Sequence, residues 1–322
     1  MRRLMNPRVI GITLGVLALM AVSAYVLKVP LPAIVLPAEP IACIGGHLEP
    51  AEHGLHCASG FPFTNSMAAT LVADLTIFLV FFFALRNKKL IPSGLQNAVE
   101  AVIEWFYTLV EDIAGKENAR TFFPIVMTIF TFALFANWWE LVPGMDAFGW
   151  IVEKHHGDGW ARKELFAGVY TLVKEKGHYT LVPWLRTATT DLNVTIAMAL
   201  IAVAYVQIAG VRFQGWKYFK KFIRPGYMSG GLMATVLDVF VGFLELISEL
   251  ARIVSFSFRL FGNIFAGTVL LFVMPYLIPL FVPLPFYGLE VFVGMIQAFV
   301  FAVLTLVFIV MAIISHGEHE GH

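Results

Sequence analysis

Charged residues are scarce in this sequence, and the two signs cancel. Of the 322 residues 14% are charged, and the 22 Lys and Arg residues match the 22 Asp and Glu residues in number. A protein that binds nucleic acid through its phosphates needs a basic surface, so a net charge of zero argues against that class. A GxGxxG motif and a P-loop are also missing, so we predict no nucleotide site and no cofactor.

Histidine is missing from the hydrophobic runs. All nine histidines fall in loops or in the C-terminal tail. A haem-bearing membrane subunit needs axial ligands at mid-membrane depth, so a redox subunit of that kind is disfavoured. Internal repeats, which mark many secondary transporters, are not found either.

Cysteine is nearly absent as well. The two cysteines, Cys43 and Cys57, fall in one Gly- and Pro-rich segment without apolar periodicity. We predict a disulfide in an oxidising compartment, where closing such a loop contributes about 3 kcal/mol. Two free thiols are the alternative, and a metal site with the nearby His47, His53 and His56 is the least favoured reading.

Long hydrophobic runs, by contrast, are abundant. A run of about 20 apolar residues can cross a bilayer as a helix. The sequence therefore predicts an all-α, polytopic membrane protein with about six hydrophobic helices. Two of the runs exceed one crossing and predict long, tilted helices. The runs lie near residues 9–27, 66–85, 122–143, 190–211, 231–274 and 286–314.

The boundaries of these runs carry further expectations. The first run follows three arginines and ends in small residues, as a signal peptide does, but we expect it to be retained as an anchor. Residues 231–274 have no strong break before Pro275 and predict one helix, after which a proline-rich segment turns the chain back. Residues 93–114 carry glutamates opposite an apolar stripe and predict an amphipathic helix along the membrane surface.

Basic residues predict the orientation. Five basic and no acidic residues occur between Arg212 and Arg224, which favours a cytoplasmic position for this stretch. The six basic residues in the 144–189 loop are weak contrary evidence. We predict a multi-pass protein of the bacterial plasma membrane with both termini in the cytoplasm.

The chain divides into three predicted parts. Residues 1–64 form an N-terminal anchor with an outside segment, residues 65–315 form the main membrane domain, and residues 316–322 form a His-rich tail. The tail histidines could bind metal, but a solvated tail is favoured.

The fifth hydrophobic run, residues 231–274, carries a polar stripe. Its polar residues are separated by steps of three or four, which places them on one helix face. In the last run Glu290 and Gln297 are seven residues apart and also share a face. Two such stripes predict a wet seam between helices. The stripe of the fifth run comprises Glu245, Glu249, Arg252, Ser255, Arg259 and Asn263.

Arg259 is the predicted functional centre. A guanidinium cannot escape burial by losing its proton. Placing it at mid-bilayer costs about 3 kcal/mol, so such charges usually line a polar path. The alternatives are an arginine that snorkels to the headgroups or one that pairs with a neighbouring glutamate.

Carboxylic acids along the same seam can take up and release protons, which arginine cannot. Acids leading inward from each side, with a fixed positive charge between them, would admit protons and block direct leakage. Asn137 with Glu140, and Asp191 with Asn193, flank the outer helix ends. Helix capping is the alternative for Asp191.

Together these residues resemble subunit a of the F-type ATP synthases. The signature is Ser255-Phe-Ser-Phe-Arg259-Leu-Phe-Gly-Asn263 followed by Ala266-Gly267, with Gln297-Ala-Phe on the last helix. Weaker matches are Asn137-Trp-Trp-Glu140-Leu-Val-Pro143 and Asp191-Leu-Asn193-Val-Thr195. The resemblance covers roughly residues 65–315.

The resemblance implies a stator beside a rotating ring of c subunits, with two aqueous half-channels that couple proton flow to ATP synthesis. Arg259 would face the ring carboxylate, and Asn263 and Gln297 would line the same interface. The implied partners are the c ring, the peripheral-stalk subunit b, membrane lipid and, indirectly, the soluble catalytic sector. The chain would hold no catalytic site of its own.

The resemblance also assigns an outer access path. Glu245 and Glu290 would belong to it, and the two outer polar pairs would lie near its mouth. Many bacterial members carry a glutamate nine residues after the arginine and a histidine on the last helix. Here these positions are Thr268 and Glu290, so the acid has moved to the facing helix.

A stand-alone ion channel or secondary transporter is the competing hypothesis. In that case the polar stripe would bind the substrate. Ion flux by the purified single chain would support it. The missing repeats count against it.

Overall fold

The computed structural model describes most of the chain in two compact units. The first comprises the described residues up to Thr70 together with Asn137–Thr190 and Asn263–Met295, and the second comprises Leu71–Ala136, Asp191–Gly262 and the described residues from Ile296 onward. Several helices run from one unit into the other. The structure describes residues 15–16, 18–22, 38–51, 54–142, 144–145, 148–153, 159–166, 169–221, 231–279 and 281–314.

The predicted polytopic helical fold is confirmed. Five helices in the described ranges are long and apolar enough to cross a membrane. They are α2 (Asn65–Leu85), α4 (Lys116–Trp139), α5 (Leu192–Gln214), the Val239–Leu277 part of α6 (Gly231–Leu277), and α7 (Pro283–Ile313). Of the first predicted run, only residues 15–16 and 18–22 are described, and they are helical.

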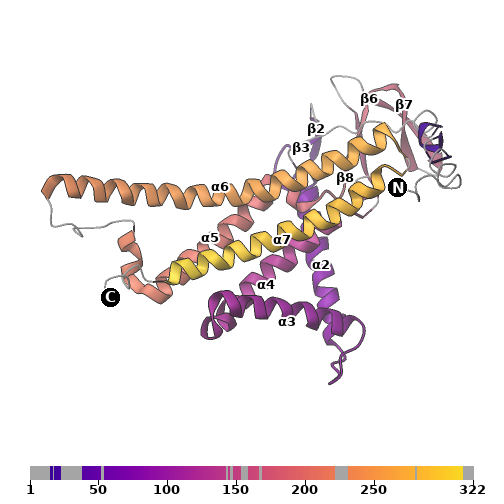
Figure 1. The fold of residues 1–322 in the computed structure, drawn as a ribbon. Coiled ribbons are helices and arrows are strands. Elements are labelled where there is room, and N and C mark those ends of the chain that lie inside the picture. The colour runs from indigo at the N-terminus through magenta and orange to yellow at the C-terminus, as the bar shows by residue number, and fades with distance from the viewer. Residues whose placement is uncertain are drawn as a thin grey trace, which may run out of the picture. The chain divides into compact units, whose positions relative to one another are not determined.

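The fifth run is one helix, as expected from its unbroken apolar sequence. α6 extends over 47 residues without interruption (Figure 1). It continues past Pro275 to Leu277, so that proline does not end it. Pro283 is the first residue of α7. Proline is tolerated there because the backbone N–H groups of a first helical turn have no acceptor within the helix.

Aromatic side chains form the core of the second unit. α3 (Leu95–Ala114) occupies the predicted amphipathic segment and turns Phe106 inward. The Phe106 ring stacks on Phe130 of α4 at 4.6 Å between centroids. On the other side of the unit, the rings of Phe256 on α6 and Phe301 on α7 lie 5.0 Å apart. These contacts hold four helices of the unit together through large apolar surfaces.

Eight strands of the first unit were not predicted. β1 pairs with β4 and β2 with β3, all antiparallel, and the later strands form a sheet in the order β5-β8-β6-β7. Six of these strands have only four or five residues, so any alternation of polar and apolar residues in them is too brief to read from sequence. The strands are β1 (Pro40–Ile44), β2 (Leu48–Ala51), β3 (Gly54–Cys57), β4 (Phe61–Thr64), β5 (Gly149–Glu153), β6 (Gly159–Phe166), β7 (Val169–Gly177) and β8 (Tyr179–Pro183).

A disulfide joins the two N-terminal hairpins. Cys43 on β1 and Cys57 on β3 are bonded, with their Cα atoms 5.8 Å apart. Within the described ranges no group of three or more His, Cys, Asp or Glu side chains is arranged to hold a metal ion. His53 lies outside those ranges.

Asn65, the first residue of α2, connects three segments of the first unit. Its Nδ2 donates to the Pro183 carbonyl at the end of β8 (3.3 Å), and its Oδ1 accepts from the Glu39 N–H (3.2 Å). The Asn65 N–H donates in turn to the Glu39 carbonyl (3.0 Å). Because Asn65 is fully buried, each of these bonds satisfies a group that water cannot reach.

Glu39 precedes β1 and is buried beside this junction. Burial raises the pKa of its carboxyl from 4.5 to about 7, and the nearby Arg186 opposes that rise. The folded state therefore favours the protonated carboxyl. The stabilising contribution of Glu39 is complete below pH 4.5 and is lost as the pH rises through 7.

We expect Glu39→Gln to remove this pH dependence. In the wild-type protein, hydrogen-exchange protection of residues 38–51 and 54–64, corrected for intrinsic exchange, should fall between pH 5 and pH 8. In the variant it should stay nearly constant. Glu49→Gln on β2, which replaces an exposed carboxylate, is the matched control and should behave as wild type. Equal pH profiles for the wild-type and Glu39→Gln proteins would contradict the role of burial.

Candidate functional site

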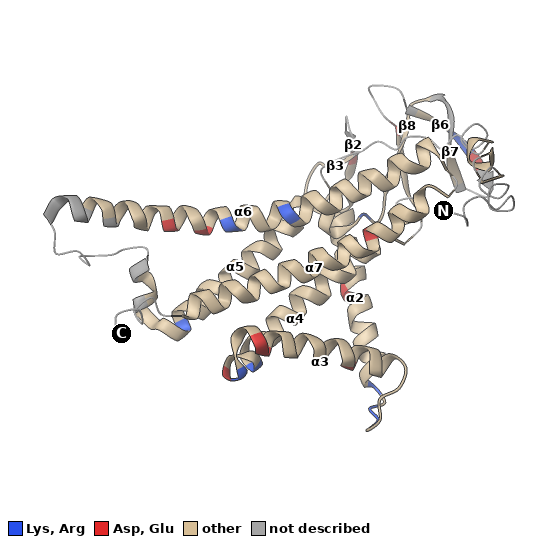
Figure 2. Ribbon diagram, viewed as in Figure 1, with Lys and Arg blue, Asp and Glu red and all other residues tan. Residues whose placement is uncertain are grey.

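The polar face of α6 in the second unit contains two arginines with different surroundings. Glu249 is buried, and its Oε2 accepts from Arg252 Nη1 at 2.7 Å. The Arg252 guanidinium also lies over the Phe308 ring of α7, 4.2 Å from its centroid. Arg252 is therefore neutralised by an acid and packed within the unit as a structural ion pair. Figure 2 shows acidic and basic residues along α6.

Arg259 is different. Its Nη2 donates to Ser255 Oγ at 3.5 Å, and no carboxylate among the described residues lies within 4.0 Å of its guanidinium. Ser255 and Phe258 beside it are exposed. The alternative reading, in which Arg259 pairs with a neighbouring glutamate, therefore does not describe this geometry. Arg259 itself is half-buried, so part of its side chain remains at the surface of the second unit.

A second cluster of predicted residues lies where α4 meets α7 in the first unit. Asn137 Nδ2 donates to the Gly294 carbonyl at 3.0 Å, and Asn137 Oδ1 accepts from Thr189 Oγ1 at 2.9 Å. Trp138 Nε1 donates to the Val291 carbonyl at 3.2 Å. A Cβ at position 294 would stand 3.2 Å from Asn137 Cβ, so glycine there permits the close approach. Asn137 thus joins α4 to α7 and to the 3-10 helix η2 (Ala188–Thr190).

In the same unit, two acids from other segments of the chain contact two consecutive residues of α6. Glu140 Oε1 accepts a hydrogen bond from Thr268 Oγ1. Glu290 of α7 lies against Gly267, where a Cβ would overlap its carboxyl group. Both glutamates are buried, and Glu290 Oε1 has no hydrogen-bond partner among the described residues. A buried oxygen without a hydrogen-bond partner costs free energy. Binding of a proton or of a water molecule at the Glu290 carboxyl would lower that cost.

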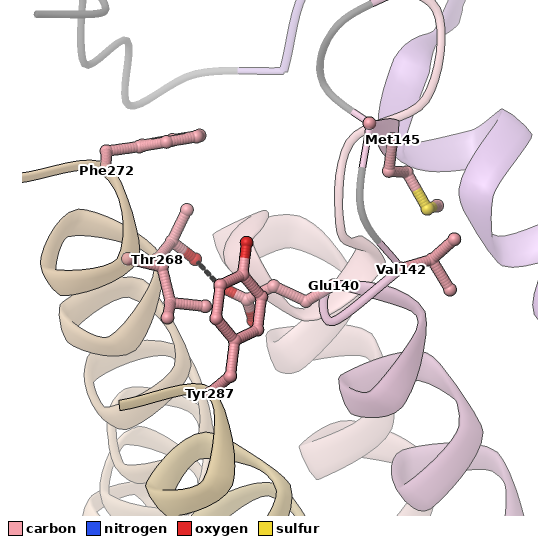
Figure 3. A pocket seen from close by; sticks show the side chains of 8 residues that line it. Glu140, Val142, Met145, Thr268, Phe272 and Tyr287 are labelled. Atoms are coloured by element: carbon pink, nitrogen blue, oxygen red, sulfur yellow. Dashed lines mark hydrogen bonds between the residues drawn. The ribbon is translucent and has the colours of Figure 1, made fainter. Parts of the chain in front are cut away.

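A cavity of about 230 Å³ opens beside Glu140 and Thr268. Its size accommodates several water molecules. Figure 3 shows the Thr268 hydroxyl and the Glu140 carboxylate pointing toward each other at its wall, with the Tyr287 ring beside them. The lining residues are Glu140, Val142, Gly144, Met145, Thr268, Leu271, Phe272 and Tyr287. Proton transfer between carboxyl groups and water is the chemistry that such a wall supports.

The remaining predicted residues have simpler surroundings. Asp191 is the N-cap of α5, and its Oδ1 accepts from the Asn193 N–H at 2.9 Å, as the capping alternative expected. The Asn193 side chain and Asn263 are exposed, while Glu245 and Gln297 are half-buried. Asn137, Glu140, Asn263 and Glu290 belong to the first unit, and the other predicted polar residues belong to the second.

The predicted site residues did not include four contributors to the first-unit cluster. The contacts of Thr189, Gly267, Thr268 and Gly294 with the predicted residues appear only in the structure. Gly267 belongs to the arginine signature and Thr268 follows it, which was the available signal. Thr189 and Gly294 carry no comparable signal, because a threonine just before a helix and a glycine in an apolar run are both ordinary.

Comparison with known proteins was made on the whole chain. Residues 67–310 match the family model described as ATP synthase A chain. A protein of Helicobacter hepaticus named ATP synthase subunit a is 30% identical over 251 residues, which are 78% of this chain and 90% of that protein. Its namesake in Helicobacter pylori strain Shi470 is 31% identical over 266 residues, or 82% of this chain and 95% of that protein.

The matched region includes Arg259, both acids at the α6–α7 contact and the α4–α7 junction. It leaves out the two N-terminal hairpins and includes the four-stranded sheet. The family match covers well over half of the chain, and the relatives are matched over most of their length. The chain is therefore a multi-pass membrane protein that belongs to the ATP synthase A chain family.

Proposed function

We propose that the chain is the proton-carrying stator subunit of an F-type ATP synthase. It would provide two half-channels beside a rotating ring of c subunits, so that each proton passes from one half-channel to the other on a ring carboxylate. The observation that carries this proposal is the contrast between Arg252 and Arg259. Arg252 is paired within the chain, whereas Arg259 lies at an accessible surface with no carboxylate of the described chain beside it.

Arg259 fits the task of separating the two half-channels. It stays protonated at any accessible pH, so it can attract a ring carboxylate only while that carboxylate is ionised. It cannot pass a proton on. A fixed positive charge also repels protons that would otherwise leak directly from one half-channel to the other. Ser255, Asn263 and Gln297 are the polar neighbours proposed for the same interface.

One half-channel is proposed in the first unit. The cavity beside Glu140 supports water entry, and the Thr268 hydroxyl connects Glu140 to α6. Glu290, one residue away at Gly267, is the proposed proton-relay acid in place of the glutamate that many relatives carry at position 268. Asn137 positions α4 and α7 around this path, and Asp191 with Asn193 forms the start of α5.

The other half-channel is proposed around Glu245 and Glu249. Glu245 precedes Arg259 by fourteen residues, about 21 Å along the helix, whereas Thr268 follows Arg259. On one continuous helix these residues lie on opposite sides of the arginine. We therefore assign Glu245 to the path opposite that of Glu290, rather than to the same outer path as first expected from the resemblance.

The proposed setting follows from this role. The chain would lie in a bacterial plasma membrane with both termini in the cytoplasm, in contact with the c ring and with subunit b of the peripheral stalk. It would act on the soluble catalytic sector only through these partners. It would bind no nucleotide and no metal itself.

Arg259→Ala should abolish coupled proton transport. With the charge removed, nothing attracts the ring carboxylate or blocks leakage, so ATP-driven acidification of inverted membrane vesicles should fall at least tenfold. Thr108→Ala on α3 removes an exposed hydroxyl that donates to the Glu104 carbonyl of its own helix, and should keep acidification within about twofold of wild type. Complex assembly is measured in both variants. Normal acidification by an assembled Arg259→Ala complex would refute the proposal.

Gly267→Ala should impair transport through Glu290. The added methyl group overlaps the Glu290 carboxyl and must displace it, so we expect a several-fold loss of acidification with assembly retained. Gly288→Ala is the matched control on α7, because a Cβ there meets no atom within 4 Å. Glu290→Gln should lose activity as well. Equal activity of the Gly267→Ala and Gly288→Ala complexes would remove Glu290 from the proposed path.

A further inference from the structure

Polar side chains that are usually exposed are buried in a connected group in the first unit. Threonine, serine, asparagine and glutamate are mostly found at protein surfaces. Here a set of them, each less than a tenth exposed, extends from the residue before β1 to just past the end of α4. We call this set the buried polar track. It comprises Glu39, Asn65, Ser66, Thr187, Thr189, Thr190, Asn137 and Glu140.

Hydrogen bonds connect successive parts of the buried polar track. Asn65 holds the N-terminal hairpins to the carbonyl of the last residue of β8 (3.3 Å). In the segment that follows β8, Thr190 Oγ1 donates to the Thr187 carbonyl at 2.7 Å. Thr189 Oγ1 donates to Asn137 Oδ1 at 2.9 Å. A threonine hydroxyl both donates and accepts, so it can take up one proton while it releases another. This segment thus carries exchangeable hydroxyl groups from the hairpins to α4.

Glu39 is the ionisable group at the hairpin end of the track. Its backbone N–H and carbonyl bond to Asn65, whereas its carboxyl forms no hydrogen bond or ion pair with a described residue. Burial raises the pKa of this carboxyl to about 7, against the opposing charge of Arg186. Glu39 therefore exchanges its proton near neutral pH. The hairpins' other described ionisable side chains are all exposed, namely His47, Glu49 and His56.

The disulfide indicates on which side of the membrane Glu39 lies. Cys43 follows Glu39 by four residues and is bonded to Cys57. Such bonds persist outside the cytoplasm, which is the side from which a bacterial synthase would take up protons. Glu39 lies outside residues 67–310, which match the family model, whereas the threonines of the track lie inside them. The N-terminal hairpins therefore add an acid to polar residues of the matched region.

We propose that Glu39 collects protons from the outer solution and delivers them along the buried polar track toward Glu140. This inference rests on the proposed function and extends the half-channel of the first unit to its entrance. The Glu39 carboxylate takes up a proton from water and releases it to a track hydroxyl or an intervening water molecule, so the carboxylate is regenerated and only O–H bonds form and break. Free protons become scarce as the pH rises toward neutrality. An acid that holds its proton up to about pH 7 keeps a supply at the entrance.

The test is ATP synthesis by the purified complex in liposomes, with the pH varied on the side from which protons are taken up. A potassium diffusion potential is adjusted so that the total driving force stays constant, and each variant is compared with wild type at the same pH. Glu39→Gln should retain the rate within about twofold at pH 5, where protons are abundant, and lose it several-fold at pH 8. Glu49→Gln, the exposed control on β2, should match wild type at both values. An equal loss at both pH values, or no loss at either, would overturn the proposal.

A purely structural role of Glu39 predicts the opposite sign. Its contribution to stability is lost as the pH rises through 7, so replacement by glutamine favours the folded state most at pH 8. A structural role would therefore give the Glu39→Gln complex its best relative rate at pH 8. Proton collection gives it its worst relative rate there. The subunit composition of each purified complex is measured alongside the rates.

Thr189 tests the route. Thr189→Val keeps the shape of the side chain but removes the hydroxyl that donates to Asn137, so it should reproduce the loss that is selective for pH 8. Thr189→Ser keeps a hydroxyl and should recover most of the rate at pH 8. A Thr189→Val complex as active at pH 8 as the Thr189→Ser complex would remove the threonine segment from the path.

The inference and the proposed function fail separately. Arg259→Ala is expected to stop synthesis at every pH, whereas Glu39→Gln is expected to slow it only where protons are scarce. Loss of synthesis in Arg259→Ala together with a flat pH response of Glu39→Gln would overturn the role of Glu39 alone. Normal synthesis by an assembled Arg259→Ala complex would refute the stator mechanism, whatever the Glu39 variant shows.

Discussion

The permanent charge of Arg259 is the constraint around which the rest of the structure is organised. A membrane protein can hide an acid by protonating it, but a guanidinium must be matched by a polar or charged neighbour. At Arg252 the chain supplies that neighbour in Glu249, and the pair packs against Phe308. At Arg259 the described chain supplies a serine at 3.5 Å and the ring of Phe256, whose centroid lies 5.9 Å from the guanidinium carbon, but no carboxylate. The same residue type on the same helix face is thus paired with an acid at position 252 and has no described carboxylate beside it at position 259.

The acids around α6 differ from the arginine because they can be neutral. Glu140 and Glu290 are both buried, and Glu290 forms no ion pair with another residue of the described ranges. Glu140 meets a hydroxyl, and Glu290 occupies the space that a glycine leaves empty. A carboxyl group in such surroundings can exist with or without its proton at moderate cost. Under the proposed function, the fixed charge and the exchangeable protons would belong to different residues, as separate access paths on either side of a barrier require.

Hydropathy and helical period made the membrane fold predictable. The predicted runs reappear as α2, α4, α5, α6 and α7, because each helix satisfies its own backbone hydrogen bonds and needs only enough apolar length. The eight strands of the first unit could not be predicted in the same way. A strand such as Tyr179–Pro183 is stable only through its pairing with the distant Gly149–Glu153, and such pairings leave little trace in a short sequence window. The disulfide could be predicted because the chain has only two cysteines, Cys43 and Cys57, and both lie in one segment. The hydrogen bonds of Asn65 could not be predicted without the fold.

The sequence by itself determined the membrane class, the long α6, the polar stripe and the identity of the arginine, because these follow from residue type and helical spacing along one segment. Only the tertiary structure decided which polar residues meet. It placed Glu140 on Thr268 and Glu290 against Gly267, and used Asn137 to join helices. These outcomes depend on which faces of different helices pack together. A pattern along one segment carries no information about which residue of another segment it will meet.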